Sequence, residues 1–366
     1  MRSFRNLADV DLELPDAGCV VVGPNGHGKT SLFEALLYGE IFRSYRGAGD
    51  RDLVRFGADG FRVECTVVRG GSSVQTPQTP QWSAGGSGQV VVAAGYDART
   101  RAKKVTVDGA EPERLADAIG IVRGVVLSPT DVRLVAGAPR ERRHYLDVLL
   151  AITVRGYVEQ LATYRRALRH RVRSSAADVE TWEHVLAESG AKVARTRQAW
   201  AERWAARYAQ HCVAMGESGE PELGYVTRVE GGNVHVLREA LAGSREQDLA
   251  RGRTSVGPHR DELRLTLDGR SLRTYGSAGQ QRTAALALRL LEAETLRELT
   301  GEPATICLDD AFAELDEVRS RCLGLLIELL AGDGAQVIAA VPRESDVPEA
   351  MAALPRWRIR NGRVEA

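Results

Sequence analysis

The sequence lacks any apolar run near the 18 or so residues that a membrane-spanning helix needs. Residues 1–14 contain acidic side chains and no apolar stretch of the kind found in signal peptides. Hydrophobic residues make up 43% of the chain and charged residues 27%, as in an ordinary soluble protein with an ample core. We therefore expect a cytoplasmic protein with no membrane partner, and 366 residues favour two domains or one large domain with an insertion.

Cysteine is also scarce, and its pattern excludes two classes of protein. The five cysteines are scattered, with no C-x-x-C pair and no histidine at ligand spacing, so neither a disulfide framework nor a zinc site is indicated. We expect reduced core thiols. The formal net charge is zero, which argues against a protein that coats nucleic acid over its whole surface but leaves room for local charged patches.

Lysine is nearly absent. Of 49 Lys and Arg residues, four are lysines (Lys29, Lys103, Lys104 and Lys192), which leaves 45 arginines. Lys29 lies in Gly23-Pro24-Asn25-Gly26-His27-Gly28-Lys29-Thr30-Ser31, between the β-branched run 19–22 and an apolar segment of helical character. This is a Walker A pattern, in which backbone N–H groups and a helix N-terminus bind phosphates, the lysine reaches the β- and γ-phosphates, and the Thr30 hydroxyl can bind Mg²⁺. We assign all nine residues to an ATP site.

A second acidic element supports that assignment. The apolar run 305–308 ends in Asp309 and Asp310, as in a Walker B strand. Asp309 is placed to hold Mg²⁺ together with Thr30, and Asp310 to orient or deprotonate the attacking water, with Lys29 as its catalytic partner. The alternative is that the two acids merely end a strand and begin a loop.

Alternating and apolar runs predict an α/β fold with an antiparallel β subdomain. We expect strands over 4–14, 61–68, 90–93, 103–107, 125–127 and 336–341, and hairpin turns at Asp108-Gly109 and Asn361-Gly362. Residues 70–89 are rich in Gly, Ser, Pro and Gln and predict a mobile surface loop.

From residue 139 the apolar period becomes helical. One stripe runs through Tyr157, Leu161, Tyr164, Leu168 and Val172, and a second through Trp182, Leu186, Val193, Trp200, Trp204 and Tyr208, with a turn at 174–178 between them. These stripes predict an antiparallel helical hairpin. Further strands are expected at 225–227, 234–236 and 263–267. The resulting division is an ATPase head over 1–138, a helical insertion over 139–220 and the rest of the head over 221–366.

The order of the motifs resembles that of ABC-type ATPases. Gly276-Ser277-Ala278-Gly279-Gln280-Gln281 opens a long predicted helix about 30 residues before the Walker B strand, and Glu314-Leu315-Asp316 follows that strand. The resemblance implies that Ser277, Gly279 and Gln280 form a signature motif that closes over the γ-phosphate bound by a second subunit, and that Asp316 belongs to the D-loop. It therefore implies a homodimer that sandwiches ATP.

Within that superfamily the chain resembles the RecF family of bacterial recombination mediators. The resemblance lies in Pro129 to Asp147 with its paired arginines, in Gly257-Pro258-His259-Arg260-Asp261, and in Leu308 to Leu323. Departures are Thr130 in place of an acid and the three residues before Phe4, which indicate either a short first strand or a start codon placed late. No histidine follows the strand ending at Val341, so fast turnover is not expected.

The resemblance implies a weak, DNA-stimulated ATPase that uses ATP and Mg²⁺ as a switch. Such a protein dimerises on ATP, clamps DNA at duplex and single-strand junctions or gaps, and works with RecO and RecR to load RecA in DNA repair. A structural head of the SMC and Rad50 kind, which tethers distant DNA, is the alternative. A transporter ATPase fits poorly, because neither a switch histidine nor a membrane partner is indicated.

One segment suggests a DNA contact. Residues 140–173 contain nine arginines and three acids, a balance of about +6 in a neutral chain. The candidates for phosphate contact are Arg165, Arg166, Arg169, Arg171 and Arg173. A solvated helix face balanced by Asp178, Glu180, Glu183 and Glu188 explains the pattern equally well. Arg142 and Arg143 are either DNA contacts or buried partners of carboxylates. His259 and Arg260 either act at the nucleotide or the domain seam or form an ordinary turn.

Overall fold

The computed structural model describes residues 1–68, 88–174, 178–227, 232–313, 315–332 and 334–365. The chain forms two compact units. Unit 1 contains residues 1–131 and 288–366, and unit 2 contains residues 132–287. The predicted loop over 70–89 lies outside the described residues except for its last two positions, of which Gln89 begins a strand.

Unit 1 is built on a six-stranded sheet in the order β12-β11-β1-β10-β9-β5. Its strands are β1 (Gly18–Val22), β5 (Gly124–Leu127), β9 (Thr305–Asp309), β10 (Val337–Val341), β11 (Arg356–Arg360) and β12 (Arg363–Glu365). All pairs are parallel except β11 with β12. The inner strands are apolar because both faces of a parallel sheet are covered.

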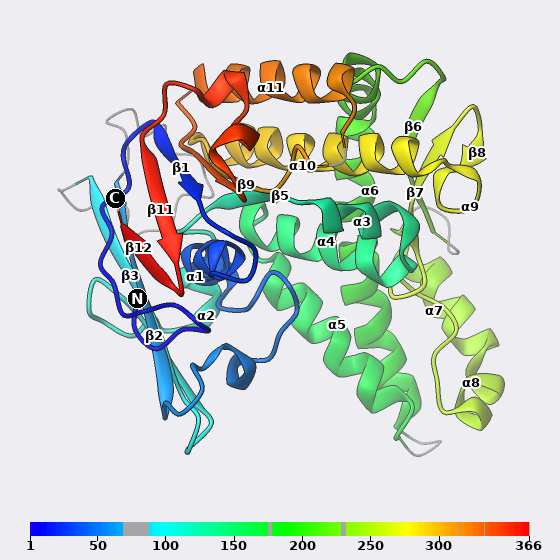
Figure 1. Cartoon of the computed structure of the whole chain (residues 1–366). Helices are drawn as coiled ribbons and strands as arrows, with labels where there is room; N and C mark the ends of the chain where they lie inside the picture. The colour runs from blue at the N-terminus through cyan, green and yellow to red at the C-terminus, as the bar shows by residue number, and fades with distance from the viewer. Residues whose placement is uncertain (69–87, 175–177, 228–231, 314, 333, 366) are drawn as a thin grey trace. The chain divides into compact units, whose positions relative to one another are not determined.

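Helix α1 (Lys29–Ile41) packs between this sheet and a second, antiparallel one (Figure 1). The second sheet has the order β2-β3-β4, with β2 (Gly60–Val68), β3 (Gln89–Asp97) and β4 (Ala102–Val107). The rings of Phe4, Tyr38 and Phe61 meet edge to face, with centroids 5.1–6.2 Å apart. This confirms the predicted antiparallel subdomain and packs the C-terminal half of α1, through Tyr38, against the second sheet.

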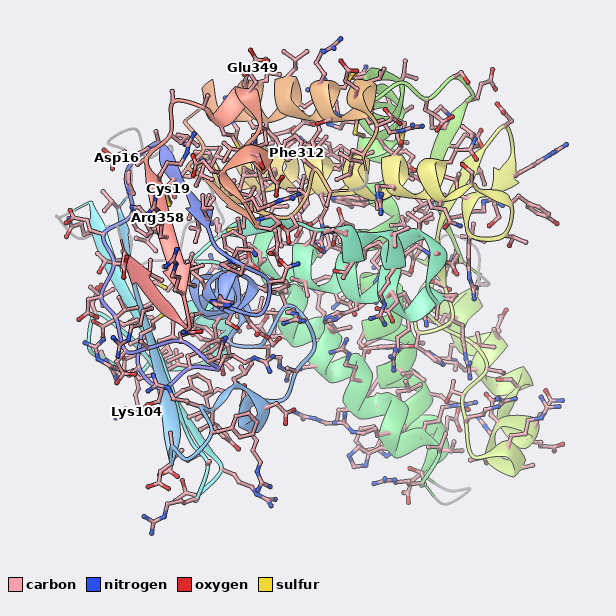
Figure 2. The ribbon with its side chains drawn as sticks, in the orientation of Figure 1. Asp16, Cys19, Lys104, Phe312, Glu349 and Arg358 are labelled. Atoms are coloured by element: carbon pink, nitrogen blue, oxygen red, sulfur yellow. The ribbon has the colours of Figure 1, made fainter. Side chains whose placement is uncertain are left out.

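The remaining elements of unit 1 are short except for two helices. Helix α11 (Glu317–Gly332) and the C-terminal part of α10 (Ala278–Thr300) lie on the side of the sheet opposite α1 (Figure 1). Figure 2 shows side chains filling the space between these layers, with Cys19 within β1. The short elements are η1 (Asp50–Leu53), α2 (Leu115–Ala118), η3 (Pro129–Asp131), η5 (Glu344–Asp346) and η6 (Glu349–Met351).

Unit 2 is mostly helical. Its helices are α3 (Val132–Ala136), α4 (Pro139–Thr153), α5 (Tyr157–Arg171), α6 (Val179–Ala214), α7 (Val234–Gly243), α8 (Arg245–Arg251), α9 (Leu272–Tyr275) and the start of α10. A small antiparallel sheet joins β6 (Pro221–Val226), β7 (Glu262–Leu267) and β8 (Arg270–Ser271). Asp268 and Gly269 form the β7–β8 turn, both with positive φ.

Helices α5 and α6 form the predicted helical hairpin. The buried positions of α5 include Tyr157, Leu161 and Tyr164, as the first stripe predicts. On α6, Gly190 permits the close approach, because a Cβ there would lie 2.9 Å from the Tyr164 ring. The predicted turn at 174–178 has its middle residues, 175–177, outside the described part of the chain.

Two predicted strands are wrong. Residues 4–14 contain a single isolated bridge, from Phe4 to Val54, because their amides bond to several neighbouring segments instead of one ladder. Residues 234–236 begin α7 and do not form a strand. Asn233 caps that helix by accepting from the His235 amide, and Leu237 and Leu241 bury one helical face. The alternating stretch there is too short to outweigh the cap.

The predicted domain boundaries also differ from the compact units. The stretch 221–287, assigned to the head, lies in unit 2 because β6 packs on α6 and pairs with β7. Unit 2 begins at Val132, and the predicted insertion begins at residue 139. Periodicity marks where helices are, but a domain border is set by which surfaces bury each other.

The paired arginines and the Gly257 to Asp261 stretch are internal ties of unit 2. Arg142 is buried and donates to Glu262 at 2.6 Å, and Arg143 donates to the Asp261 carbonyl at 2.7 Å. Arg197 is buried and bridges Asp147, at 2.7 Å, to the Pro258 carbonyl, at 2.8 Å. Of the two interpretations that the sequence leaves open, the structure favours a buried structural partner for Arg142, while Arg143 is partly buried and bonds to a carbonyl.

His259 has a structural part in the same network. Its Nε2 donates to the Thr254 carbonyl at 2.9 Å, so Nδ1 accepts from the Tyr164 hydroxyl at 2.6 Å. Burial lowers the pKa of His259 to about 4. The ring is therefore neutral at physiological pH and holds the 254–261 loop on α5.

Glu40 provides a test of the core of unit 1. Its carboxyl group is buried and accepts a hydrogen bond from the Gly124 amide at 3.1 Å. Burial raises the pKa of Glu40 to about 8. The neighbouring Glu292 adds to this rise, and the charges of Arg289 and Arg123 oppose it. Between about pH 4.5 and 8 the folded chain holds a proton that the unfolded chain releases, so stability falls as pH rises. Glu40→Gln keeps a side-chain oxygen that can accept from the Gly124 amide. It removes the pH-dependent loss of stability, which is about 2–3 kcal/mol at pH 7.

The measurement is urea unfolding at pH 5.5, 7 and 8.5. We expect the free energy of unfolding of the variant, relative to that of the wild type, to increase as the pH rises. Parallel curves at all three values would show that Glu40 is not protonated in the folded state.

Candidate nucleotide-binding site

The loop between β1 and α1 leaves a helix N-terminus without a cap. Gly26 and Gly28 have φ of 80° and 113°, which L side chains rarely adopt. Gly28 is the N-cap of α1 and gives no side-chain hydrogen bond, and the first turn contains no acid. The first N–H groups of the helix and its partial positive charge are therefore available to an anion.

Two segments far away in the sequence hold this loop. Asn6 donates to the Gly26 carbonyl at 3.1 Å and accepts from the Ser31 hydroxyl at 2.9 Å. From the β11–β12 turn, the Gly362 amide donates to the His27 carbonyl at 2.9 Å and the Asn361 amide to His27 Nδ1 at 3.1 Å. The Asn361-Gly362 hairpin predicted from the sequence is confirmed, and it supports the loop.

Lys29 lies inside the loop and not in solvent. It is buried, and its Nζ donates to the Gly23 carbonyl at 2.7 Å and to Asn25 Oδ1 at 3.1 Å. A Cβ at Gly23 would lie 2.3 Å from the Ile359 carbonyl, so the loop passes directly over β11. Neither of these two hydrogen-bond partners is a carboxylate.

The carboxylates of the Walker B strand lie at the same sheet edge as the loop. Strand β10 pairs with both β1 and β9, and the Gly23 amide donates to the Val341 carbonyl at 3.1 Å. Because the carboxyl ends of parallel strands share an edge, Asp309 meets the start of α1. Burial raises the pKa of Asp309, while a hydrogen bond with Thr30 and the charge of Lys29 oppose the rise.

Asp310 has an unusual backbone and an unsatisfied oxygen. Its φ is 52°, and its amide donates to the Ala340 carbonyl at 3.1 Å. Phe312, two residues later in the chain, is labelled in Figure 2. Its Oδ1 is buried without a hydrogen-bond partner among the described residues. Burial raises the pKa of Asp310, with Lys29 opposing. A buried carboxylate oxygen that lacks a donor is suited to accept from water or a ligand.

These residues fit a magnesium nucleoside triphosphate. The uncapped helix end and Lys29 suit phosphate oxygens, and Thr30 with Asp309 offers two oxygen ligands side by side. Mg²⁺ takes one or two protein oxygens and completes its shell with phosphates and water. The described residues contain no group of three or more His, Cys, Asp or Glu side chains that could hold a metal ion.

Sequence reasoning missed two residues at this edge. The Tyr45 hydroxyl is buried without a hydrogen-bond partner among the described residues. Burial raises the pKa of Tyr45, and the negative charge of Asp309 raises it further. The exposed Arg46 lowers the pKa of Asp309. They follow α1 in an irregular loop, where no periodicity marks a site, and no local pattern indicates that this loop returns to β9.

The signature and D-loop residues cap helices. In unit 2, the Ser277 amide donates to Gln280 Oε1 at 2.9 Å and the Gln280 amide to Ser277 Oγ at 3.2 Å, a reciprocal cap of α10 that includes Gly279 in its first turn. In unit 1, Asp316 caps α11 by accepting from the Arg319 amide at 2.8 Å. Glu314 lies outside the described residues. Ser277 is exposed, and its hydroxyl hydrogen is still available to an external acceptor.

One of the five proposed DNA contacts is corrected by the structure. Arg171 is 0% exposed and bonds to Glu183 at 3.0 Å, Asp248 at 2.8 Å and the Leu241 carbonyl at 2.8 Å. It falls on the buried face of α5, seven residues after Tyr164, so it cannot reach a DNA phosphate. The +6 balance of 140–173 therefore overstates the positive charge that the surface presents.

The other four candidates are accessible. Arg165 is half-exposed and binds Asp147 at 2.9 Å. Arg166, Arg169 and Arg173 are exposed, and among the described residues no ion pair joins their side chains to an acid. Glu183 is engaged by Arg171 and Arg245, and Glu188 pairs with His184. The balancing acids of the alternative interpretation are thus partly used elsewhere.

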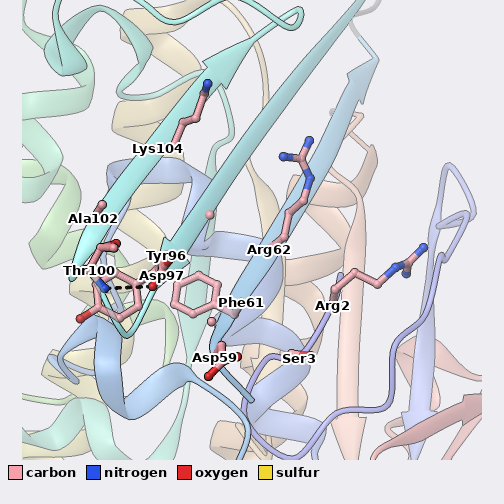
Figure 3. A pocket seen from close by; sticks show the side chains of 12 residues that line it. Arg2, Ser3, Asp59, Phe61, Arg62, Tyr96, Asp97, Thr100, Ala102 and Lys104 are labelled. Carbon is pink, nitrogen blue, oxygen red and sulfur yellow. Dashed lines mark hydrogen bonds between the residues drawn. The ribbon is translucent and has the colours of Figure 1, made fainter.

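A groove along the β2-β3-β4 sheet contains none of the residues of this site. It encloses about 550 Å³ and is lined by Phe61, Tyr96, Asp97 and nearby residues (Figure 3). The cations at its rim are each paired with an acid: Arg2 with Asp11, Arg62 with Glu64 and Lys104 with Glu111, at 2.6–2.8 Å. It therefore does not offer free positive charge to an anion.

Comparison with known proteins decides the family. The chain is 34% identical to the DNA replication and repair protein RecF of Chloroflexus aurantiacus over all of this chain and 98% of that protein. It is 32% identical to the protein of the same name from Roseiflexus castenholzii, over 99% of this chain and 97% of the relative. The chain belongs to the RecF family. No protein-family model matches the chain.

Solved structures agree with this assignment. The recombination mediator protein RecF of the RecFOR pathway, solved as RecF-ATP, superposes with a TM-score of 0.86 at 27% identity, over 99% of this chain and 95% of that one. RecF-ATPrS gives 0.85 at 28% identity, with the same coverage. An SMC head bound to a ScpA domain gives 0.54 at 14% identity and shows a shared fold. The predicted ATPase-head fold class of this RecF-family chain is confirmed.

No helix among the described residues has the length and apolar character that crossing a membrane requires.

Lys29→Met tests the site directly. Removing the ammonium that faces the loop should weaken ATP binding about 100-fold, because the variant cannot make charge-assisted bonds to the phosphates. Titration calorimetry with Mg-ATP measures the affinity. Lys104→Met, a surface lysine of the same unit, is the control and should bind as wild type; an unchanged affinity of Lys29→Met would place the nucleotide elsewhere.

Proposed function

We propose that this RecF-family protein is an ATP-switched DNA clamp of recombinational repair. ATP with Mg²⁺ closes a homodimer on DNA at gaps or duplex and single-strand junctions, the clamp acts with RecO and RecR in loading RecA, and slow hydrolysis releases it. The observation that carries the proposal is the uncapped N-terminus of α1 beside Lys29, with the Thr30, Asp309 and Asp310 oxygens at the same edge.

Each residue of the site has a role in this proposal. The loop 23–31 binds the triphosphate, Lys29 neutralises the β- and γ-phosphates, and Thr30 with Asp309 would hold Mg²⁺, which supplies positive charge to the transferring phosphoryl group. Asp310, whose Oδ1 has no donor among the described residues, orients the attacking water. The raised pKa of Asp310 favours its taking a proton from that water.

Dimerisation rests on the signature residues. Ser277 is exposed at the N-terminus of the 23-residue α10, with a hydroxyl hydrogen to donate and amides of Ala278 and Gly279 in the first turn. This is a second anion-binding helix end in the same chain. We propose that it binds the γ-phosphate held by the partner subunit, with Asp316 at the facing D-loop, so that the triphosphate joins the two copies.

The DNA surface lies at the end of unit 2 and draws on two helices. Arg166 and Arg169 are exposed near the C-terminal end of α5, and Arg173 is exposed two residues after the helix ends. The buried Arg171 of α5 donates to Asp248 of α8 and to Thr254, which follows α8. These bonds hold α8 near the end of α5, so the exposed Arg251 and Arg253 lie next to that end. We propose that these five arginines contact phosphates, with Arg165 at the edge of the surface.

The hairpin favours a clamp over a tether. The 36 residues of α6 extend about 54 Å at 1.5 Å per residue, and the partner α5 has 15 residues. Arms of this length reach along a local stretch of duplex but cannot join distant DNA segments. The shared fold with SMC heads therefore does not imply tethering.

Ser277→Arg tests the composite site. The longer cation should clash with the partner's nucleotide while leaving the loop 23–31 intact, so we expect ATP binding within about threefold of wild type and no ATP-dependent dimer. Sedimentation velocity with Mg-ATP measures the dimer. Ala242→Arg, an exposed position on α7, is the matched control. A variant at Ser277 that both binds ATP and dimerises would contradict the sandwich.

The DNA surface is tested by changing Arg166, Arg169 and Arg173 to Ala together. DNA affinity should fall, and the slope of log affinity against log salt should decrease by about 2 to 3, because each arginine neutralises roughly one phosphate. Fluorescence anisotropy on gapped duplex at several salt concentrations gives both values. The charge-matched control changes the exposed Arg51, Arg99 and Arg101 of unit 1. Equal losses of affinity in both triple variants would mean that the end of unit 2 is not the site.

A further inference from the structure

Helix α11 presents an apolar stripe on its exposed side. Val318, Leu325 and Leu329 are 59%, 60% and 61% exposed, and Cys322, partly buried, completes the row. The opposite face buries Leu323, Gly324, Ile327 and Leu330 against unit 1. In Figure 1, α11 is an outer helix of that unit, so the stripe is not explained by packing within it.

The stripe has the spacing of a coiled-coil seam. Steps of 4, 3 and 4 residues separate positions 318, 322, 325 and 329, which are successive d, a, d and a positions of a heptad. The row is about 16 Å long, since a helix rises 1.5 Å per residue. Exposed apolar rows of this regularity on a soluble protein mark a contact surface for another helix.

The charges beside the stripe identify the occupant. Arg321 and Glu328 occupy the two g positions on one side of the row, and Arg321 pairs with the exposed Glu317 at 2.9 Å. Such an exposed pair contributes little and is easily exchanged. When two copies of the helix pack antiparallel, the g positions of the two copies face each other, so each Arg321 meets a Glu328 of the other copy. A parallel pair does not bring these two opposite charges together.

We propose that α11 is a self-association surface on which a second copy of this chain docks its own α11 in antiparallel orientation. Val318 then packs on Leu329 of the other copy and Cys322 on Leu325, and a twofold axis relates the halves. This contact does not involve the nucleotide and so goes beyond the ATP-dependent dimer of the proposed function. A single helix pair buries less than the roughly 1,200 Å² of a stable interface, so the association is weak and serves to connect molecules already concentrated on DNA.

Sedimentation equilibrium of the full chain without nucleotide, from about 5 to 500 μM, measures this association. We expect a reversible monomer–dimer equilibrium for the wild type and for Lys29→Met, so the result is independent of the ATP site. Leu325→Glu should weaken it at least tenfold, because it buries a charge in the seam. Leu115→Glu, the same change at an exposed leucine of α2, should have no effect.

Two further variants test the antiparallel register. Arg321→Glu should weaken the dimer and the double change Arg321→Glu with Glu328→Arg should restore it, since the two charges meet across the axis. Leu325→Cys should form a disulfide with Cys322 of the other copy under mild oxidation. A monomer at all concentrations, association that Leu325→Glu does not affect, a dimer that requires ATP, or a wild-type Cys322–Cys322 crosslink would each overturn the proposal.

Discussion

The structure of unit 1 depends on one constraint, which is that a helix N-terminus without a cap must lie at the sheet edge where the parallel strand β9 ends in Asp309 and is followed by Asp310. Strand β10 sits between β1 and β9 and fixes their spacing, so Thr30 and Asp309 come within hydrogen-bonding reach. The positive end of α1, the Lys29 ammonium and the two acids are then close enough to interact electrostatically. In the function proposed above, a magnesium nucleotide would satisfy the donors and acceptors at this edge.

Residues around the site hold the phosphate loop in its conformation. Glycines with positive φ shape the loop, and the ends of the chain hold it from outside, through Asn6 on one side and the Asn361-Gly362 turn on the other. A Cβ at Gly362 would lie 1.9 Å from the Asn6 carbonyl, so these two supports also pack on each other. Of these two supports, the Asn361-Gly362 turn has a local sequence signal, whereas the segment around Asn6 does not form the strand that its alternation predicts.

Unit 2 uses charge differently. Its buried arginines are structural: Arg142, Arg171 and Arg197 each join segments that are distant in the sequence, and each has carboxylate and carbonyl partners. Breaking one partner of such a network leaves an unpaired buried charge, which destabilises a protein by about 3–5 kcal/mol. The arginines of unit 2 therefore serve two purposes. Some form buried ion pairs and hydrogen bonds within the unit, and others lie at the surface, where they can contact an anionic partner.

Elements with strong local signals could be predicted from the amino-acid sequence alone. The Gly-rich loop, the acidic strand end, the helical stripes of α5 and α6 and the Asn-Gly and Asp-Gly turns belong to this group, because each depends on residues close together in the chain. Packing between distant segments settles instead that Arg171 is buried and Arg173 is not, that 221–287 belongs to unit 2, and that residues 234–236 are helical. Burial, domain membership and the return of Tyr45 to Asp309 arise from long-range packing, and no local pattern encodes them.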